Sequence, residues 1–266
     1  MTSIIENLKN LCYNIEPGEI MVIIDKLSQD ANINTLIFDI DGTITRWKNV
    51  KSFLEKSLTE LGVPYTDDAL QGMYKAMELR EYHSIITAES DEDVYSALLG
   101  MCIPSLKEHN VTGRQLKDTM FELEASETFI EEDVPRELEQ LAQDYKLYCY
   151  TNWFRNQALK KLDRYDLTKY FEAVHSSEDN YVKFSKVGFI YLIEKYHLNP
   201  QRTLHVGDSE SDIVPSKNAG IHSIYLDYGI KTPDDLTEKK MKLMHKADAT
   251  VTEFSDIQKV LTKRIR

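Results

Sequence analysis

Short apolar runs separated by helix-like segments dominate the chain from residue 135 to residue 227. Most runs are apolar throughout rather than alternating, which is typical of strands covered on both faces of a parallel sheet. We therefore predict an α/β fold with a Rossmann-like parallel sheet core. The predicted strands are 35–40, 146–151, 171–176, 202–208 and 222–227, and the predicted helices are 135–144, 154–164, 186–196 and 212–219, with a weaker strand and helix within 247–263.

Residues 47–128 interrupt this alternation. They contain several helical patterns and almost no strand signal, and they are too many for an ordinary loop. We predict that they form an all-helical domain inserted into the core, which then comprises residues 34–46 and 129–266. Residues 1–33 resemble two short helical segments broken at Pro17–Gly18, and we expect this extension to pack on the outside of the core.

Acidic residues outnumber basic residues by 44 to 32, so the formal net charge is −12. Such a chain repels nucleic acid and anionic membrane surfaces unless basic residues gather locally. The basic segment 237–246 is interpreted more simply as a solvated helix or loop. No run approaches the roughly 20 apolar residues that span a bilayer. We therefore expect neither nucleic acid nor a membrane as a partner, and no pattern specifies an oligomeric state.

The cysteines of the chain indicate a reducing compartment. Cys12, Cys102 and Cys149 are odd in number, far apart in the sequence and without metal-ligand spacing. Residues 1–30 lack the basic start and continuous apolar stretch of a signal peptide. We therefore predict a cytoplasmic protein.

Polar side chains follow four of the predicted strands. In a parallel α/β sheet, ligands bind outside the carboxyl ends of the strands, so these side chains are expected to converge on one edge. In chain order they are Asp39 and Asp41, then Thr151 and Asn152, then Lys183, and finally Asp208 and Asp212.

The four aspartates of this set predict a metal site. Carboxylates held close together repel one another, and a divalent cation is the natural compensating partner. Because the set contains no His or Cys, its hard oxygen ligands favour Mg²⁺, which would in turn attract phosphate. Taken alone, Asp39 and Asp41 could belong to an ordinary turn. Asp212 could likewise be only the N-cap of the next helix.

In this order, the motifs resemble those of the haloacid dehalogenase (HAD) superfamily of aspartate-nucleophile phosphohydrolases. The segment "DIDGT" at 39–43 is similar to the first motif, Thr151 to the second, Lys183 to the third and "GDSESD" at 207–212 to the fourth. The resemblance covers roughly residues 34–230. It also implies that residues 47–128 are a helical cap, inserted between the first and second motifs.

The resemblance implies a role for each residue of the set. Asp39 would attack phosphorus and become an aspartyl phosphate, and Asp41 would act as general acid and base. Thr151, Lys183 and the backbone near Asn152 would hold the phosphate. The implied Mg²⁺ ligands are Asp39, the backbone carbonyl of Asp41, Asp208 and, directly or through another ligand, Asp212.

One residue assignment and the exact reaction stay open. The third motif commonly reads Lys-Pro, whereas this chain has "VKFSK" at 182–186, so Lys186 competes with the favoured Lys183. The expected function is Mg²⁺-dependent hydrolysis of a small phosphorylated metabolite. The alternatives are a phosphomutase of the same superfamily and a non-catalytic, phosphate-binding regulatory protein. The substrate is not identified, because its selection lies in the inserted residues.

Overall fold

A computed structural model of the protein describes residues 24–25, 27, 32–48, 50–67, 70, 108–179 and 182–262. Its strands are β1 (Ile24–Asp25), β2 (Thr35–Phe38), β3 (Arg46–Trp47), β4 (Thr128–Phe129), β5 (Lys146–Tyr150), β6 (Ala173–His175), β7 (Thr203–Gly207), β8 (His222–Leu226) and β9 (Ala249–Val251). Its helices are α2 (Val50–Glu60), α6 (Gly113–Glu127), α7 (Val134–Asp144), α8 (Arg155–Asp163), α9 (Lys186–Tyr196), α10 (Glu210–Asn218), α11 (Glu238–Lys246) and α12 (Asp256–Thr262).

The main sheet has the strand order β1-β9-β8-β7-β2-β5-β6. From β9 to β6 all neighbours are parallel, which confirms the predicted Rossmann-like core. The chain runs from β2 outward through β5 to β6 and then returns to β7, on the other side of β2. In open α/β sheets, such a reversal marks the place where ligands bind, which here is at the carboxyl ends of β2 and β7.

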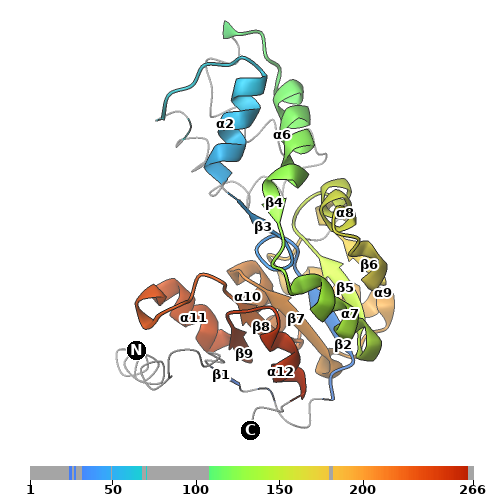
Figure 1. Ribbon diagram of the computed structural model, residues 1–266. Helices are drawn as coiled ribbons and strands as arrows, with labels where there is room; N and C mark the ends of the chain where they lie inside the picture. The colour runs from blue at the N-terminus through green and yellow to red at the C-terminus, as the bar shows by residue number, and fades with distance from the viewer. Residues whose placement is uncertain are drawn as a thin grey trace.

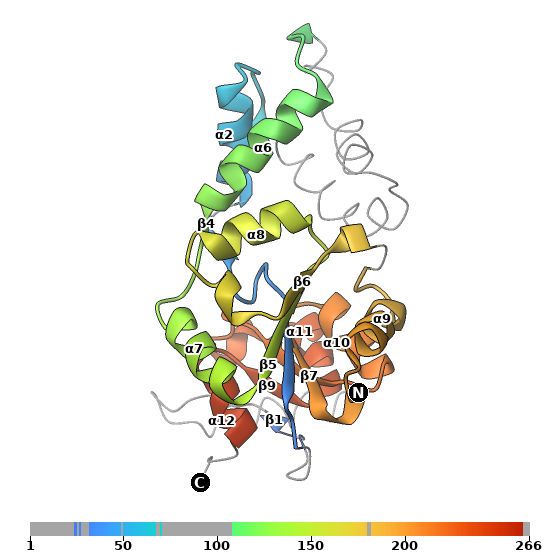
Figure 2. The same cartoon turned by 90° about the vertical axis from the view of Figure 1, so that its right-hand side faces the viewer.

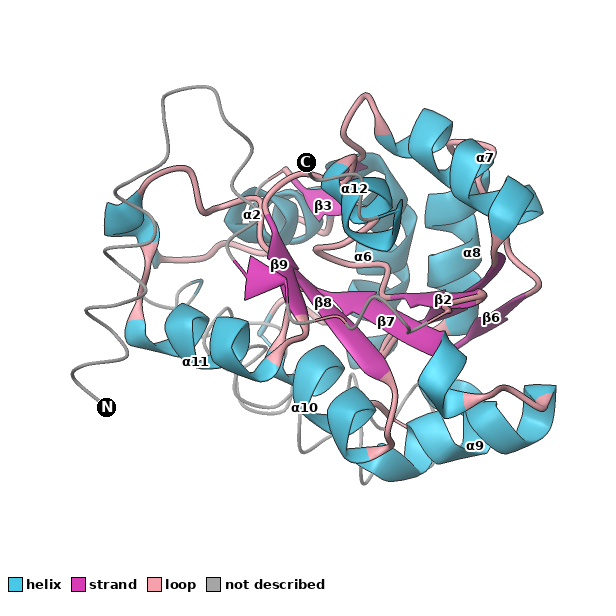
Figure 3. Ribbon diagram, turned by 90° about the horizontal axis from the view of Figure 1, so that it is seen from below, coloured by secondary structure: helices cyan, strands magenta, loops and turns pink. Residues whose placement is uncertain are grey.

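Helices cover both faces of the sheet, with α7, α8 and α12 on one side and α9, α10 and α11 on the other (Figure 3). Successive side chains of a strand point to opposite faces. In β2, Leu36 and Phe38 therefore join the core cluster that contains residues of α7 and α12. Ile37 packs in a separate cluster with Phe189 of α9. Burial on both faces explains why β2 is a continuous apolar run.

Helices α2 and α6 pack against each other and stand beyond the sheet (Figures 1 and 2). The short antiparallel strands β3 and β4 lie where the chain leaves and re-enters the core. Leu58, Leu116 and Met120 of the two helices share an apolar cluster with Phe154, which precedes α8. The helical patterns within residues 71–107 lie outside the described residues.

The predicted helical character of residues 1–33 is wrong for Ile24 and Asp25, which form β1 antiparallel to β9. The outer edge of β9 has backbone groups that a neighbouring strand can satisfy, and this demand outweighs a weak local helical pattern. Residues 1–23 lie outside the described residues. In the described part of the chain, no helix has both the length and the apolar character needed to cross a bilayer.

His175 links β6 to α9 inside the fold. Its side chain is 2% exposed. Nε2 lies 2.6 Å from the Tyr196 hydroxyl, and Nδ1 lies 3.3 Å from Asp179 Oδ2. Burial, together with the nearby Lys195 and Arg155, lowers the pKa of His175 to about 4, although Asp179 opposes the shift. The folded protein therefore favours the neutral imidazole.

Because the pKa of His175 is lower in the folded state than in the unfolded chain, its contribution to stability should be complete above about pH 6.5 and decline as the pH falls toward 4. Between about pH 7.5 and pH 5, the wild type should lose about 2 kcal/mol more unfolding free energy than His175→Gln. Urea unfolding at the two pH values measures this difference. The exposed His109→Gln should retain the wild-type acid sensitivity, and equal losses in wild type and His175→Gln would contradict the prediction.

Candidate active site

Asp39 directly follows β2 and continues its pairing with β7, because its backbone N–H donates to the Val206 carbonyl at 2.9 Å. The residue is only 6% exposed. The pairing fixes the direction of the Asp39 backbone, so that its carboxylate lies at the carboxyl edge of the sheet.

Asp41 lies within a tight turn at residues 40–45, which directly follows Asp39. The N–H groups of Ile44 and Thr45 donate to the Ile40 carbonyl at 3.0 and 2.8 Å, and the Gly42 N–H donates to the Thr45 carbonyl at 2.7 Å. Gly42 has a φ of +87°, which favours glycine. A Cβ atom at this position would lie 2.1 Å from Asp208 Oδ2. The turn can therefore pass this close to Asp208 only with a glycine.

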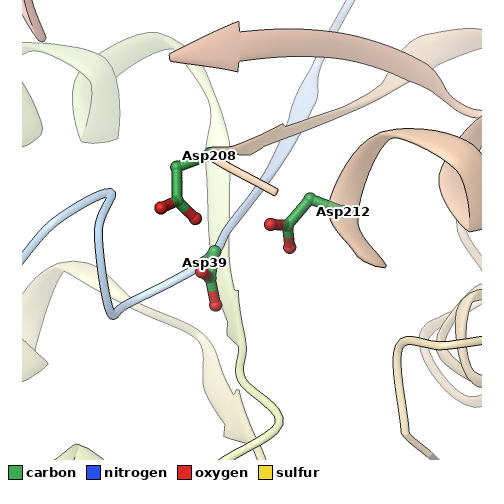
Figure 4. Close-up of side chains that lie close together, drawn as sticks. All are labelled: Asp39, Asp208 and Asp212. Atoms are coloured by element: carbon green, nitrogen blue, oxygen red, sulfur yellow. The ribbon is translucent and has the colours of Figure 1, made fainter. Parts of the chain in front are cut away.

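Asp39, Asp208 and Asp212 form an acidic group at this edge, with one carboxylate oxygen of each within 4.8 Å of the others. Figure 4 shows that the three side chains gather around a common space. Burial, followed by the charge of Asp212, raises the pKa of Asp39 to about 8. Burial and the charges of Asp212 and Asp39 also raise the pKa of Asp208. A divalent cation fits this all-oxygen group, because its charge would relieve the repulsion.

Lys183 lies inside this group and is 1% exposed. Its Nζ contacts Asp39 Oδ1 and lies 2.6 Å from Asp212 Oδ1. Burial alone would lower the pKa of Lys183, but the charges of Asp212 and Asp39 outweigh it and raise the pKa, so the ammonium form persists. Lys186 is exposed at the start of α9. The geometry thus favours Lys183 over Lys186 as the lysine of the site.

Asp212 is the third residue of α10, and Ser209 is the N-cap. Asp212 Oδ2 accepts hydrogen bonds from the Ser209 backbone N–H at 3.0 Å and hydroxyl at 2.5 Å, while Oδ1 lies 3.1 Å from His205 Nε2. Burial would raise the pKa of Asp212, but Lys183 and His205 lower it. Both carboxylate oxygens therefore have protein partners, and Asp212 fixes Lys183 in addition to contributing to the acidic group.

Thr151 and Asn152 follow β5 at the same edge. Thr151 is 2% exposed, and its Oγ1 accepts a hydrogen bond from the Trp153 N–H at 3.0 Å. The Asn152 Oδ1 accepts a hydrogen bond from the Lys183 backbone N–H at 2.7 Å. The Asn152 side chain thus holds the segment that carries Lys183, a function that sequence reasoning did not assign to it.

Asp41 is paired with a second lysine that sequence reasoning missed. Lys161 on α8 is fully buried, and its Nζ lies 2.6 Å from Asp41 Oδ1 and 2.5 Å from Glu124 Oε1 on α6. Burial would lower the pKa of Lys161, but the Asp41 and Glu124 carboxylates outweigh it and raise the pKa. A signal was available, because Lys161 shares the buried face of α8 with Ala158 and Leu162. A lysine at an apolar position of a helix indicates a buried partner.

A pocket of about 480 Å³ adjoins the acidic group and includes Gly42 and Asp208 in its lining. Trp47, Tyr225 and Tyr228 supply aromatic walls. A small molecule in this pocket would have direct access to Asp208.

Comparison with known proteins identifies the family of the chain. A sequence model of the haloacid dehalogenase-like hydrolases matches residues 36–226. A phosphoglycolate phosphatase from Vibrio parahaemolyticus is 27% identical over 205 residues, which cover 74% of this chain and 85% of that protein.

Two solved structures share the fold. The magnesium-bound HAD-hydrolase candidate YfnB from Bacillus subtilis has a TM-score of 0.68 at 21% identity, over 87% of this chain and 99% of its own. A β-phosphoglucomutase candidate from Thermotoga maritima has a TM-score of 0.61 at 20% identity, over 88% and 100% of the two chains. Because the family model spans most of the chain, including all four motifs, the protein belongs to the haloacid dehalogenase-like hydrolases.

Proposed function

We propose that this protein is a Mg²⁺-dependent phosphatase that hydrolyses a small phosphorylated metabolite through an aspartyl phosphate on Asp39. The family model and the phosphoglycolate phosphatase relative support the broader assignment as a HAD-like phosphatase. One observation carries the finer proposal. Asp39 is paired with Lys183 inside the acidic group, whereas Asp41 is paired with Lys161 outside it. Two aspartates in different surroundings can perform different steps.

In the first step, an Asp39 carboxylate oxygen attacks phosphorus as the bond from phosphorus to the leaving oxygen breaks. Lys183 is placed to bind the phosphate oxygens and to offset the charge of Asp39, and Thr151 lies at the same strand edge. Phosphoryl transfer depends mainly on such positioning and charge neutralisation. Asp41 gives its proton to the leaving oxygen.

In the second step, water attacks the phosphorus of the aspartyl phosphate, and Asp41 takes a proton from that water. Phosphate leaves and the Asp39 carboxylate is restored. Asp41 suits both proton transfers because its side chain is 26% exposed, whereas that of Asp39 is 9% exposed. Water can therefore reach Asp41 more readily than it reaches the nucleophile.

Mg²⁺, when bound, supplies positive charge that neutralises the phosphate oxygens. The residues that would hold it are Asp39, Asp208, the backbone carbonyl of Asp41 and Asp212. The acidic group supports this assignment because its oxygens converge and none of its members is a soft ligand.

We assign substrate choice to residues 47–128, acting as a cap, and chemistry to a core of residues 34–46 and 129–266. The packing of α2 on α6 beyond the sheet supports this division. The cytoplasmic setting stays a prediction from the sequence.

A screen of phosphate esters with Mg²⁺ tests the proposal, and phosphoglycolate is a suitable first compound because of the relative named above. Phosphate release that stops on chelation and returns with Mg²⁺ would support it. No metal-dependent release from any ester by the folded protein would contradict it and would favour a phosphate-binding regulatory protein. Product analysis separates the phosphatase from a phosphomutase, which would return the phosphoryl group to the substrate rather than to water.

Replacing Asp39 by asparagine should abolish turnover and leave the fold intact, because an amide of nearly the same shape is a poor nucleophile. Phosphate release from 4-nitrophenyl phosphate and the circular dichroism spectrum measure the two properties. The exposed Asp144→Asn is the matched control and should remain active. A folded Asp39→Asn protein with near-normal turnover would remove Asp39 from the role of nucleophile.

Replacing Asp41 by asparagine should lower turnover of alkyl phosphates by about 10²- to 10⁴-fold, because proton transfer is lost. An aryl phosphate has a better leaving oxygen, so its kcat/KM, which reports phosphorylation of Asp39, should fall less. Hydrolysis of the intermediate still needs a base, and mass spectrometry should detect one phosphoryl group on the Asp39 peptide. Equal losses for both substrates, without a trapped intermediate, would assign Asp41 to structure or metal binding.

Replacing Gly42 by alanine should weaken Mg²⁺ binding on the order of tenfold, because the new Cβ displaces the Asp208 carboxylate. Calorimetric titration with Mg²⁺ measures the change. Gly220→Ala is a suitable control, since Gly220 also has a positive φ but has no atom closer than 3.9 Å to a built Cβ. That variant should lose stability and keep its Mg²⁺ affinity. Equal affinities in both variants would show that the close approach of Gly42 does not shape the site.

A further inference from the structure

Lys161 occupies an unusual position for a lysine. It is fully buried on α8, on the same helix face as Ala158 and Leu162. Its Nζ lies 4.9 Å from the ring centroid of Trp47 and 6.0 Å from that of Trp153. A lysine is almost never fully buried unless it is paired, and here the ammonium lies between two carboxylates.

The two carboxylates come from different parts of the molecule. Asp41 belongs to the turn after β2, and its Oδ1 lies 2.6 Å from Lys161 Nζ. Glu124 belongs to α6, is 1% exposed, and has its Oε1 2.5 Å from the same Nζ. Helix α6 lies within the residues proposed to form the cap. Lys161 therefore joins the cap to the residue proposed as general acid and base.

The two aspartates of the DIDGT segment contact different lysines. Lys183 contacts Asp39 and Asp212, whereas Lys161 contacts Asp41. Without Lys161, the ammonium that contacts the Asp41 carboxylate at 2.6 Å would be lost, and this contact would no longer hold the carboxylate in the position proposed for proton transfer.

We propose that Lys161 is a positioning residue that holds the Asp41 carboxylate in place for proton transfer, and that Glu124 of α6 holds Lys161 in turn. This inference rests on the proposed function, in which Asp41 is the general acid and base. A buried ion pair is often no more stabilising than apolar residues of similar volume, so stability alone does not account for this arrangement.

The first test compares Lys161→Met with wild type on an alkyl phosphate and on 4-nitrophenyl phosphate. The kcat/KM of the alkyl substrate should fall by about 10- to 100-fold, a part of the full proton-transfer contribution. The loss on the aryl substrate should be several times smaller. Lys160→Met places the same substitution at an exposed position of the same helix and should change neither value. An equal loss for both substrates, or none, would overturn the inference.

The second test is a double-mutant cycle with Asp41→Asn. If Lys161 acts through Asp41, Lys161→Met should cause little further loss in the Asp41→Asn background. A purely structural effect of Lys161 would persist there at full size, and that result would overturn the inference. Glu124 contacts Lys161 rather than Asp41. Glu124→Gln should therefore cause a smaller loss of kcat/KM, with the same dependence on the leaving group.

Folding is checked by circular dichroism and thermal unfolding. Should Lys161→Met fail to fold, the double variant Lys161→Met/Glu124→Gln removes the buried carboxylate charge as well and is used for the same leaving-group comparison.

The two proposals fail in different ways. A folded wild type without metal-dependent turnover of any ester would overturn the proposed function, and this inference with it. If the wild type is active and Lys161→Met has the same kcat/KM values as the wild type, this inference alone is overturned.

Discussion

The Lys183 ammonium is shared by two buried carboxylates, and the rest of the site depends on this contact. Asp39 follows β2, Asp212 lies on α10 after β7, and Lys183 precedes α9. Removing one partner from a buried group of charges leaves another uncompensated, at a cost of several kcal/mol. The three segments must therefore be in their final positions before any of these charges is stably buried, so the chemistry of the site and the order of the strands depend on each other.

Much of the core could be predicted from the sequence because strands covered on both faces leave continuous apolar runs. Placing ligands at the carboxyl ends of parallel strands was then enough to bring together Asp39, Lys183, Asp208 and Asp212, which the structure also does. The pair formed by Lys161 and Glu124 was not predicted. Helical periodicity shows that a lysine faces inward, but it does not tell which distant carboxylate meets it.

Two other segments show what local patterns leave out. Strand β1 has only two residues, and it exists because β9 offers an edge, so its own sequence contains little signal. Helix α11 falls in the segment 237–246, whose basic residues predicted a solvated helix or loop. Met241 and Met244 of this helix are nevertheless buried against Ile213 and Tyr225. Long lysine side chains can remain at the surface while apolar neighbours one turn away pack inward.

Strands β3 and β4 pair with each other, so residues 48–127 begin and end at adjacent points of the fold. Because its two ends lie side by side, this segment does not have to bridge a distance between separate parts of the core. Its length and composition can change during evolution without altering the register of β2 against β5 or β7. These residues could therefore be exchanged as one block in a duplicated gene, while Asp39, Asp208 and Asp212 keep the positions that the parallel sheet gives them.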